Sequence, residues 1–334
     1  MNRARRTPLP AQRGVALLTV LLLVAVMSVL AMAMLDDVRF ATRRARNVQS
    51  VTQAQWHALG AEALARQTIL RIDAAQPGRT TLAGGWNGRS VPLPIEDGER
   101  GMATLRIRDA GNCFNLNSVV EGTVEQWQRR ELGARQYFAL LHALAFDDAQ
   151  ARQLVDTLVD WIDTDATPSP AGAEDAHYAH REPASRTAAG LLADTSELRA
   201  IAGYSASAYA RVRPYVCALP GAGLSPLNLN TLGPDDAPLL SMLTLGALDA
   251  AQARRAIAGR PAGGWTDAAA FWSQPLLAAT APPNPVLEQV ALRTRFFGVR
   301  AQVEYGDAQV VLDELLELRA GALLLRARQW DPDP

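Results

Sequence analysis

The sequence predicts an α+β fold in which a long N-terminal helix packs on an antiparallel sheet, with a large, mostly helical domain inserted between strands of that sheet. Three observations predict this fold. An uncharged apolar run near the start continues into a helical pattern, helical patterns dominate the middle, and three stretches of strand-like alternation close the chain. With 334 residues, 49% of them hydrophobic, the chain can form a membrane segment and about two folded domains.

The apolar run, residues 15–34, holds twenty residues without a charge. A helix of that length spans about 30 Å, the thickness of the hydrocarbon core of a bilayer. No proline follows until after Asp73, and apolar residues recur at helical spacing. We therefore expect one helix from Val15 to about Asp73, with residues 15–35 in the membrane. Small residues near the end of the run leave a secretory signal, cut after Ala33, as an alternative.

Between the helix and the middle of the chain, the pattern predicts loops and a strand. Residues 76–99 are rich in Gly and Pro, which predicts loops and short strands. Residues 102–108 alternate apolar and polar side chains and predict a strand. Helical patterns follow at residues 125–145, 148–162, 196–201, 206–213, 235–272 and 286–291.

The C-terminal part predicts an antiparallel meander of three strands. They cover residues 296–305, 308–318 and 322–330, separated by Gly306-Asp307 and by Gly321. Residues 315–319 contain good helix formers, but they continue the alternation of the neighbouring strands. We therefore favour a sheet here.

Two short segments echo each other: FNLNS at residues 114–118 and LNLNT at residues 227–231. Each is expected to be a short extended piece whose Asn and Ser or Thr side chains cap the next helix. We interpret the pair as the duplicated start of two helical units.

The densest polar cluster lies between residues 160 and 180. Asp163 and Asp165 are two residues apart in a loop, Glu174-Asp175 follows a Pro/Gly turn, and Asp160 lies one helical turn before Asp163. Hard oxygen ligands in a flexible loop suit Ca²⁺, so these five carboxylates are candidate calcium ligands. No EF-hand spacing is present. The alternative is a solvated acidic loop that caps helix ends.

Enzymatic motifs are absent from the sequence. No nucleophile elbow, phosphate-binding loop or dinucleotide fingerprint occurs, so we expect a protein that is not an enzyme. His177 and His180 lie three residues apart beside the acidic cluster and make a zinc site an alternative. Because no Cys and no His-Glu-x-x-His motif accompany them, exposed histidines are the favoured interpretation.

Charge gives little indication of a nucleic-acid surface. The net charge is −1, and all 33 basic residues are Arg. Even so, the LNLNT segment and the short helices around Gly246 and Gly259 are similar to helix-hairpin-helix units that grip DNA phosphates. Three arginines would support such a contact: Arg254, Arg255 and Arg260. Three carboxylates oppose it: Asp235, Asp236 and Asp249. Structural reuse of the helical unit is favoured.

Arg13-Gly14 followed directly by the apolar run resembles the signal that prepilin peptidases cut. The resemblance implies cleavage between Gly14 and Val15 and N-methylation of Val15. Most such subunits carry Glu at the fifth mature position, whereas this chain has Thr19. A carboxylate within hydrocarbon needs a partner charge, and its absence is typical of K-type minor pseudopilins of type II secretion systems. The start VALLTVLLLVA is similar to theirs.

The resemblance covers nearly the whole chain and implies a pilin-like fold. It divides the chain into a leader (1–14), the transmembrane half of the helix (15–35), the first part of a pilin-like domain (36–112), an inserted helical domain with two units (113–292) and C-terminal strands (293–334). The other specific segments are CFNLN, DWID, GAED, SELR, RPYVC and NLNT, which begin at residues 113, 160, 172, 196, 213 and 228. The family is described as binding calcium in its helical domain, which favours calcium here.

The chain has two cysteines, Cys113 and Cys217. In a cytosolic chain they would be two buried thiols. Beyond a membrane anchor, in an oxidising periplasm, we expect a disulfide that closes a loop of about a hundred residues.

The function implied by the resemblance is a minor pseudopilin that caps the tip of the type II secretion pseudopilus. It would nucleate assembly of this filament for export of folded proteins across the outer membrane. The implied partners are the I- and J-type minor pseudopilins, other pseudopilins, the inner-membrane secretion platform and the prepilin peptidase; no nucleic acid is expected. The chain would cross the bacterial inner membrane once, with its soluble domain in the periplasm.

Two other classes of protein remain as alternatives. The first is a single-pass periplasmic receptor that binds DNA through the helix-hairpin-helix-like units. The second is a signal-anchored metalloenzyme built on His177 and His180.

Overall fold

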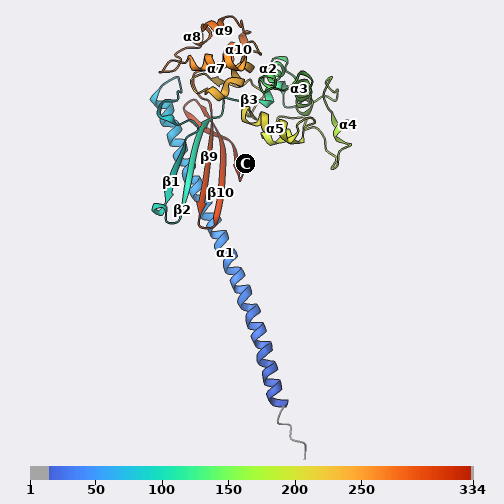
Figure 1. Ribbon diagram of the computed structural model, residues 1–334, viewed down its shortest axis with the longest axis vertical. Helices are drawn as coiled ribbons and strands as arrows, with labels where there is room; N and C mark the ends of the chain where they lie inside the picture. Colours follow the sequence, from blue (N-terminus) through green and yellow to red (C-terminus); the bar gives the residue numbers. More distant parts are fainter. Residues whose placement is uncertain (1–14, 332–334) are drawn as a thin grey trace, which may run out of the picture.

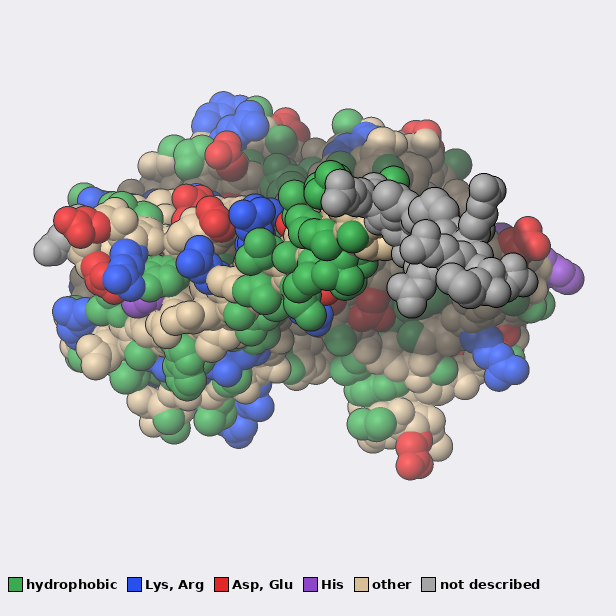
Figure 2. All heavy atoms as spheres, turned by 90° about the horizontal axis from the view of Figure 1, so that it is seen from below, with side chains coloured by type: hydrophobic (Ala, Val, Ile, Leu, Met, Phe, Trp, Pro, Cys, Tyr) green, Lys and Arg blue, Asp and Glu red, His purple; other side chains and the backbone are tan. Residues whose placement is uncertain are grey.

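Helix α1 (Val15–Ala75) runs unbroken for 61 residues and projects from a head that holds the rest of the described chain (Figure 1). The structure is a computed structural model that describes residues 15–331. Residues 15–49 of α1 are exposed. Within the described chain, α1 is the one helix long and apolar enough to cross a membrane. Seen from below, hydrophobic side chains form one group where α1 points toward the viewer, whereas charged and polar side chains are mixed over the surface of the head (Figure 2).

The second half of α1 packs on a sheet through small side chains. Its buried stripe contains Ala54, Ala58, Ala61, Ala65 and Ile69. Steps of three and four residues keep these side chains on one face of the helix. Because four of them are alanines, the helix backbone lies close to the strands. The expected helix from Val15 to about Asp73 is confirmed.

The sheet has five antiparallel strands in the order β1-β2-β9-β10-β11. Strand β2 pairs with β9, although the whole middle of the chain separates them. The strands are β1 (Ser90–Ile95), β2 (Gly101–Asp109), β9 (Phe296–Tyr305), β10 (Ala308–Arg319) and β11 (Ala322–Trp330). The C-terminal meander is confirmed, and residues 315–319 are strand, because alternate side chains of β10 fill the core under α1.

The mostly helical insertion lies between β2 and β9 and covers the end of the sheet that faces away from the exposed half of α1 (Figure 1). Its helices are α2 (Glu131–Ala143), α3 (Asp148–Ile162), α4 (Asp175–Tyr178), α5 (Ala206–Val212), α6 (Ala237–Leu243), α7 (Ala250–Ala258), α8 (Ala268–Trp272), α9 (Pro275–Ala278) and α10 (Asn284–Gln289). Its short strands are β3 (Phe114–Asn115), β4 (Val120–Thr123), β5 (Gln126–Arg129), β6 (Val216–Cys217), β7 (Leu227–Asn228) and β8 (Val290–Ala291).

Short 3₁₀ helices connect these elements. They are η1 (Ala83–Gly85), η2 (Glu96–Gly98), η3 (Leu116–Val119), η4 (Thr195–Ala200), η5 (Arg213–Tyr215) and η6 (Pro234–Asp236). The predicted α-helix at residues 196–201 is therefore a 3₁₀ helix, which an Asp194–Glu197 capping box begins.

The predicted helix at residues 125–145 is wrong in its first part. Strands β4 and β5 form an antiparallel hairpin there, and α2 begins only at Glu131. Trp127 packs its half-buried side chain against the helical core, and its carbonyl accepts a hydrogen bond from Thr164 N at 3.2 Å. These contacts come from distant parts of the chain, so tertiary packing overrides the local helix propensity.

The FNLNS and LNLNT segments make matching hydrogen bonds. The side-chain amide of Asn117 pairs with both the N–H and the C=O of Leu192, and that of Asn230 pairs with both groups of Trp265. Each segment also forms a short parallel pair, β3 with β6 and β7 with β8. The first Asn of each segment caps the turn: Asn115 accepts from Asn117 N, and Asn228 accepts from Asn230 N. The two starts thus share one local structure.

Candidate functional site

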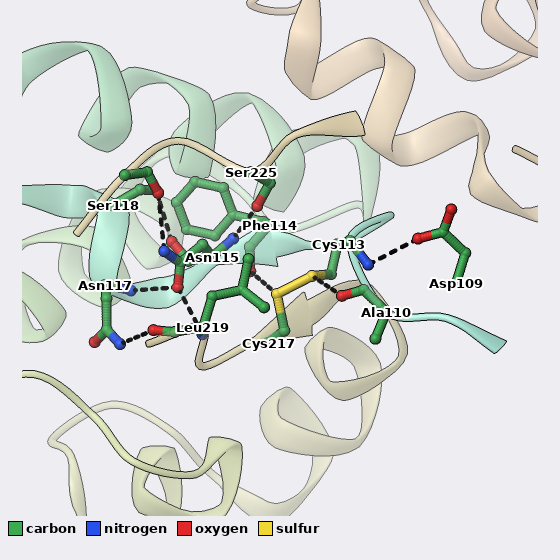
Figure 3. Close-up of a disulfide and its surroundings, with 12 residues drawn as sticks. Asp109, Ala110, Cys113, Phe114, Asn115, Asn117, Ser118, Cys217, Leu219 and Ser225 are labelled. Carbon is green, nitrogen blue, oxygen red and sulfur yellow. Dashed lines mark hydrogen bonds between the residues drawn. A yellow bond between two sulfur atoms is a disulfide. The ribbon is translucent and has the colours of Figure 1, made fainter. Parts of the chain in front are cut away.

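A disulfide joins Cys113 to Cys217, as expected for an oxidising compartment, and ties the first helical unit together at its base. The two Cα atoms lie 5.8 Å apart across a sequence separation of 104 residues. Phe114, next to Cys113, lies beside the bond (Figure 3). Strand β3 pairs with β6 there, and the Phe114 ring stacks on Tyr137 at 4.8 Å. Asn115 Oδ1 accepts a hydrogen bond from Leu219 N on the far side of the bond. The disulfide therefore locks a segment that side-chain hydrogen bonds already hold.

The acidic loop starts where α3 ends. Asp147 caps the N-terminus of α3 by accepting from Gln150 N at 2.9 Å, and the helix stops at Asp163, whose ψ of 175° is extended. The predicted bounds of α3, residues 148–162, are confirmed. The loop ends at Glu174, directly before α4. Its two ends lie near each other, since carboxylate oxygens of Asp163 and Glu174 are within 4.8 Å.

Three of the five predicted carboxylates converge. Oxygen atoms of Asp163, Asp165 and Glu174 lie within 4.8 Å of one another. Asp163 and Glu174 are buried, with 6% and 8% of their surfaces exposed, whereas Asp165 faces solvent. Like charges held this close repel one another, and burial removes the water that would screen them.

The electrostatics of this group favour a cation. Burial, followed by the charges of Asp165, Asp160 and Glu174, raises the pKa of Asp163 to about 7. Burial, followed by the charges of Asp160 and Asp165, raises the pKa of Glu174 to about 7. A divalent cation would remove both penalties, because it replaces the lost water and neutralises the mutual repulsion.

Two buried carboxylate oxygens of this group lack a hydrogen-bond partner. Asp163 Oδ1 and Glu174 Oε1 are buried and have no hydrogen-bond partner within the described chain. A buried acceptor without a partner costs about 1–3 kcal/mol, and more if it is charged. A hard cation such as Ca²⁺ prefers carboxylate oxygens of this kind. These residues therefore fit the ion that the sequence suggested.

The other two predicted ligands are engaged elsewhere. Asp160 accepts a hydrogen bond from Ser169 N at 3.1 Å with each of its oxygens. A Cβ atom on Gly172 would lie 1.8 Å from Asp160 Oδ2, so only glycine fits there. Asp175 is exposed and accepts from Thr187 N and Oγ1 at 2.9 and 3.0 Å. Asp160 and Asp175 shape the loop, while the other three carboxylates converge.

One residue of the loop architecture was missed from the sequence. Asp156 on α3 accepts from Ala171 N at 3.1 Å and from Arg129 Nη1 at 2.9 Å, which joins the loop to strand β5. The signal was present in the spacing, because Asp156, Asp160 and Asp163 recur at steps of four and three along α3 and share one face.

The zinc alternative finds no support among residues 15–331. His177 and His180 are exposed, and the one group of at least three potential ligand residues in the described chain contains neither of them. The His177 ring instead meets Tyr178 edge to face at 5.4 Å.

The DNA-binding alternative is likewise not supported. Arg260 donates hydrogen bonds to the carbonyls of Leu229 and Leu232, at 3.3 and 2.6 Å, and so holds the LNLNT turn. Arg254 and Arg255 are exposed on α7, and Asp249 caps the N-terminus of the same helix. Arg260, which would have contacted a DNA phosphate, therefore stabilises the fold of the second helical unit instead.

The fold and the site together define a class of protein: a pilin-like subunit with a long, apolar N-terminal helix, which carries a disulfide-closed helical insertion with an acidic loop. Two family models with the description "Type II secretion system (T2SS), protein K" match residues 112–221 and 227–293. The chain belongs to the type II secretion system protein K family, a family of structural pseudopilins rather than enzymes.

Similar proteins cover almost the whole chain. Type II secretion system protein K of Klebsiella pneumoniae is 38% identical over 309 residues, 92% of each chain. The protein of the same name from Pectobacterium carotovorum subsp. carotovorum is 35% identical over 324 residues, 96% of each chain. A solved chain of the GspK–GspI–GspJ complex from enterotoxigenic Escherichia coli superposes with a TM-score of 0.73 at 28% identity, and the match covers 87% of this chain and all of that one.

Proposed function

We propose that this minor pseudopilin caps the tip of the type II secretion pseudopilus and nucleates its assembly, for export of folded proteins across the outer membrane. One observation carries the proposal. The helical insertion lies on the end of the sheet opposite the exposed half of α1 (Figure 1). A subunit stacked above would meet this bulk, while subunits below still reach α1. The chain crosses the inner membrane once through residues 15–35, and its head faces the periplasm.

The start of α1 supports maturation by a prepilin peptidase. Val15 is already helical, and Thr19 Oγ1 donates to Ala16 O at 2.9 Å, so the fifth mature position carries no charge that needs a partner. The proposed cut lies before Val15; Gly14 and the rest of the leader lie outside the described residues. After the cut, Val15 is N-methylated, and the apolar half of α1 first anchors the subunit and then packs in the filament.

Processing is tested on the mature N-terminus. The chain purified from cells with an active prepilin peptidase is expected to begin at methylated Val15, and Gly14→Leu is expected to leave the leader attached. Intact-mass spectrometry with N-terminal fragmentation reads both states. A wild-type chain that keeps its leader, or that begins after Ala33, contradicts this function.

The outer face of α1 supports docking of a partner helix. Trp56 is 65% exposed and Leu70 is 40% exposed, and the exposed Gly60 and Ala63 lie between them. These positions are spaced by three, four and seven residues, which is the seam spacing of a two-helix coiled coil. Large side chains flanking small ones form a hollow for the side chains of another helix. We propose the I-type minor pseudopilin as this partner, with the J-type subunit in the same assembly, since a similar chain was solved as a GspK–GspI–GspJ complex.

The docking face is tested with Trp56→Arg. Co-expressed with the I- and J-type subunits, this variant is expected to recover at least about tenfold less of both in affinity purification, as for a truncated aromatic anchor. Val124→Arg, at the 81% exposed tip of the β4–β5 hairpin, is the matched control and should recover them normally. Equal recovery by the two variants would place the partner elsewhere.

The acidic loop is proposed to hold one calcium ion through Asp163, Asp165 and Glu174. When bound, the ion supplies positive charge that brings the end of α3 and the start of α4 together. Other assembly contacts, with further pseudopilins and with the inner-membrane secretion platform, belong to the same proposal.

A further inference from the structure

A basic segment of α1, residues 39–46, follows shortly after the apolar run. It contains four arginines: Arg39, Arg43, Arg44 and Arg46. Every side chain of the segment is exposed, because α1 begins to pack on the head only at about residue 50. The segment therefore lies on the part of α1 that projects from the head, where the rest of the described chain does not cover it (Figure 1).

The charge of this part of α1 is not balanced. Two carboxylates, Asp36 and Asp37, accompany the four arginines, and no other precedes Glu62, which leaves a net charge of four minus two, or +2. Asp36 lies 3.6 Å from Arg39 in an exposed ion pair, and exposed pairs contribute little to stability. Within the described chain, three arginines have neither an ion pair nor a hydrogen bond through their side chains: Arg43, Arg44 and Arg46.

Helix geometry places the unpaired arginines at the surface of the membrane. Each helical residue advances about 1.5 Å, so Arg43 lies about 12 Å beyond Leu35. Side chains of a helix lean toward its N-terminus, which is the membrane end of α1. A long arginine side chain therefore reaches back toward the headgroup layer, which is about 5–8 Å thick on each side of the hydrocarbon core.

Membrane topology does not account for these arginines. An excess of Lys and Arg is typical of the cytoplasmic side of a membrane, whereas this segment is proposed to face the periplasm with the head. Arg43 and Arg46 lie three residues apart on one face of the helix, where like charges repel each other. An anion between them would relieve this repulsion, and guanidinium groups bind phosphate oxygens through paired hydrogen bonds.

We propose, on the basis of the proposed membrane crossing through residues 15–35, that the basic segment binds the headgroups of anionic phospholipids. These contacts hold α1 at a fixed depth until the subunit leaves the membrane for the filament. Charge and position carry this choice of partner, because lipids that border the apolar run present their phosphates at the level that the arginines reach.

The lipid contact leaves the apolar side of the same stretch free. Four apolar residues recur there at steps of three and four: Val38, Ala41, Ala45 and Val48. At the angular spacing of an α-helix they lie on the side of α1 opposite to Arg43 and Arg46. Binding of headgroups and packing of another helix therefore use different sides of α1.

The proposal is tested by electron paramagnetic resonance of spin-labelled lipids. The full chain is reconstituted in phosphatidylcholine vesicles with a trace of labelled phosphatidylglycerol or labelled phosphatidylcholine, and the motionally restricted fraction measures association with the protein. At low ionic strength, phosphatidylglycerol is expected to associate at least about fivefold more strongly, the factor for one arginine near an anionic surface. In about 1 M salt this preference should largely disappear, because the Debye length falls to about 3 Å.

Two triple variants of equal net charge locate the effect. The first removes three charges from the basic segment: Arg43→Gln, Arg44→Gln and Arg46→Gln. The second removes three exposed charges elsewhere: Arg71→Gln, Arg254→Gln and Arg319→Gln. The first variant should lower the preference for phosphatidylglycerol at least about fivefold, and the second should keep it. Lysines in place of the three arginines of the segment should retain most of the preference, since the charge remains.

The outcomes separate this proposal from the proposed function. Equal association of the two lipids with the wild-type chain overturns the lipid contact alone, as does a preference that the first variant keeps or that the second variant loses equally. A chain that restricts neither lipid contradicts the membrane crossing, and the lipid contact with it. The processing of Val15 and the Trp56 face are tested by their own experiments.

Discussion

Replacing Cys113 and Cys217 together by serine is expected to lower the free energy of unfolding by about 4–5 kcal/mol, which is the chain-entropy term for a loop of this length. The bond closes 104 residues that contain the whole first helical unit. Without it the unfolded chain gains conformations, while the folded state keeps the β3–β6 pair and the Asn115 hydrogen bonds. Denaturant unfolding of the full chain in micelles, followed by circular dichroism, measures the change.

Reductant provides the matched control for this result. The wild-type chain should lose a similar amount of stability when its disulfide is reduced, and the double serine variant should not respond. If the variant and the oxidised wild type differ by less than about 1 kcal/mol, the disulfide does not act through the entropy of the unfolded chain.

The second large effect concerns calcium. At free calcium about 100-fold above the dissociation constant, binding should stabilise the folded chain by about 2.7 kcal/mol relative to the chelated protein. The ion does so by satisfying Asp163 Oδ1 and Glu174 Oε1 and by relieving the repulsion between the three carboxylates. Thermal unfolding of the full chain with calcium and with chelator measures the difference as a shift in melting temperature.

Two substitutions distinguish the converging carboxylates from their neighbours. Asp163→Asn should abolish the calcium response, while the chelated variant should be at least as stable as the chelated wild type, because one buried charge is gone. Asp175→Asn should keep the response, since that carboxylate is exposed and bonded to Thr187. A wild-type chain that melts at the same temperature with calcium and with chelator contains only a solvated acidic loop.

Much of the fold could be predicted because its signals are local. The bounds of α3 and β9 follow directly from periodicity, since each of these elements buries one continuous face. The β4–β5 hairpin could not be predicted in this way. Its residues carry no strand signal of their own, and its place depends on Trp127 meeting the core and Thr164. The predicted division of the chain at residues 112 and 292 remains a prediction.

The sequence predicted which carboxylates lie in the acidic loop, but not which of them come together. Spacing indicated five carboxylates, and the path of the loop decided which of them converge. A polar side chain in a loop either faces its neighbours or bonds to the nearest backbone amide, and the sequence is the same in both cases. Asp160 and Asp175 accept hydrogen bonds from the backbone amides of Ser169 and Thr187, so they do not converge with the other three carboxylates.

The sequence by itself determined that this protein has an apolar run continuous with a long helix, an antiparallel meander at its C-terminus and two helical units with matching starts. These features depend on the order of apolar and polar residues over short distances, which a helix or strand converts directly into a buried face. Only the tertiary structure decided the β2–β9 pairing and the convergence of Asp163, Asp165 and Glu174. Each of these brings together residues from separate elements, and their distances are set by how the whole chain packs.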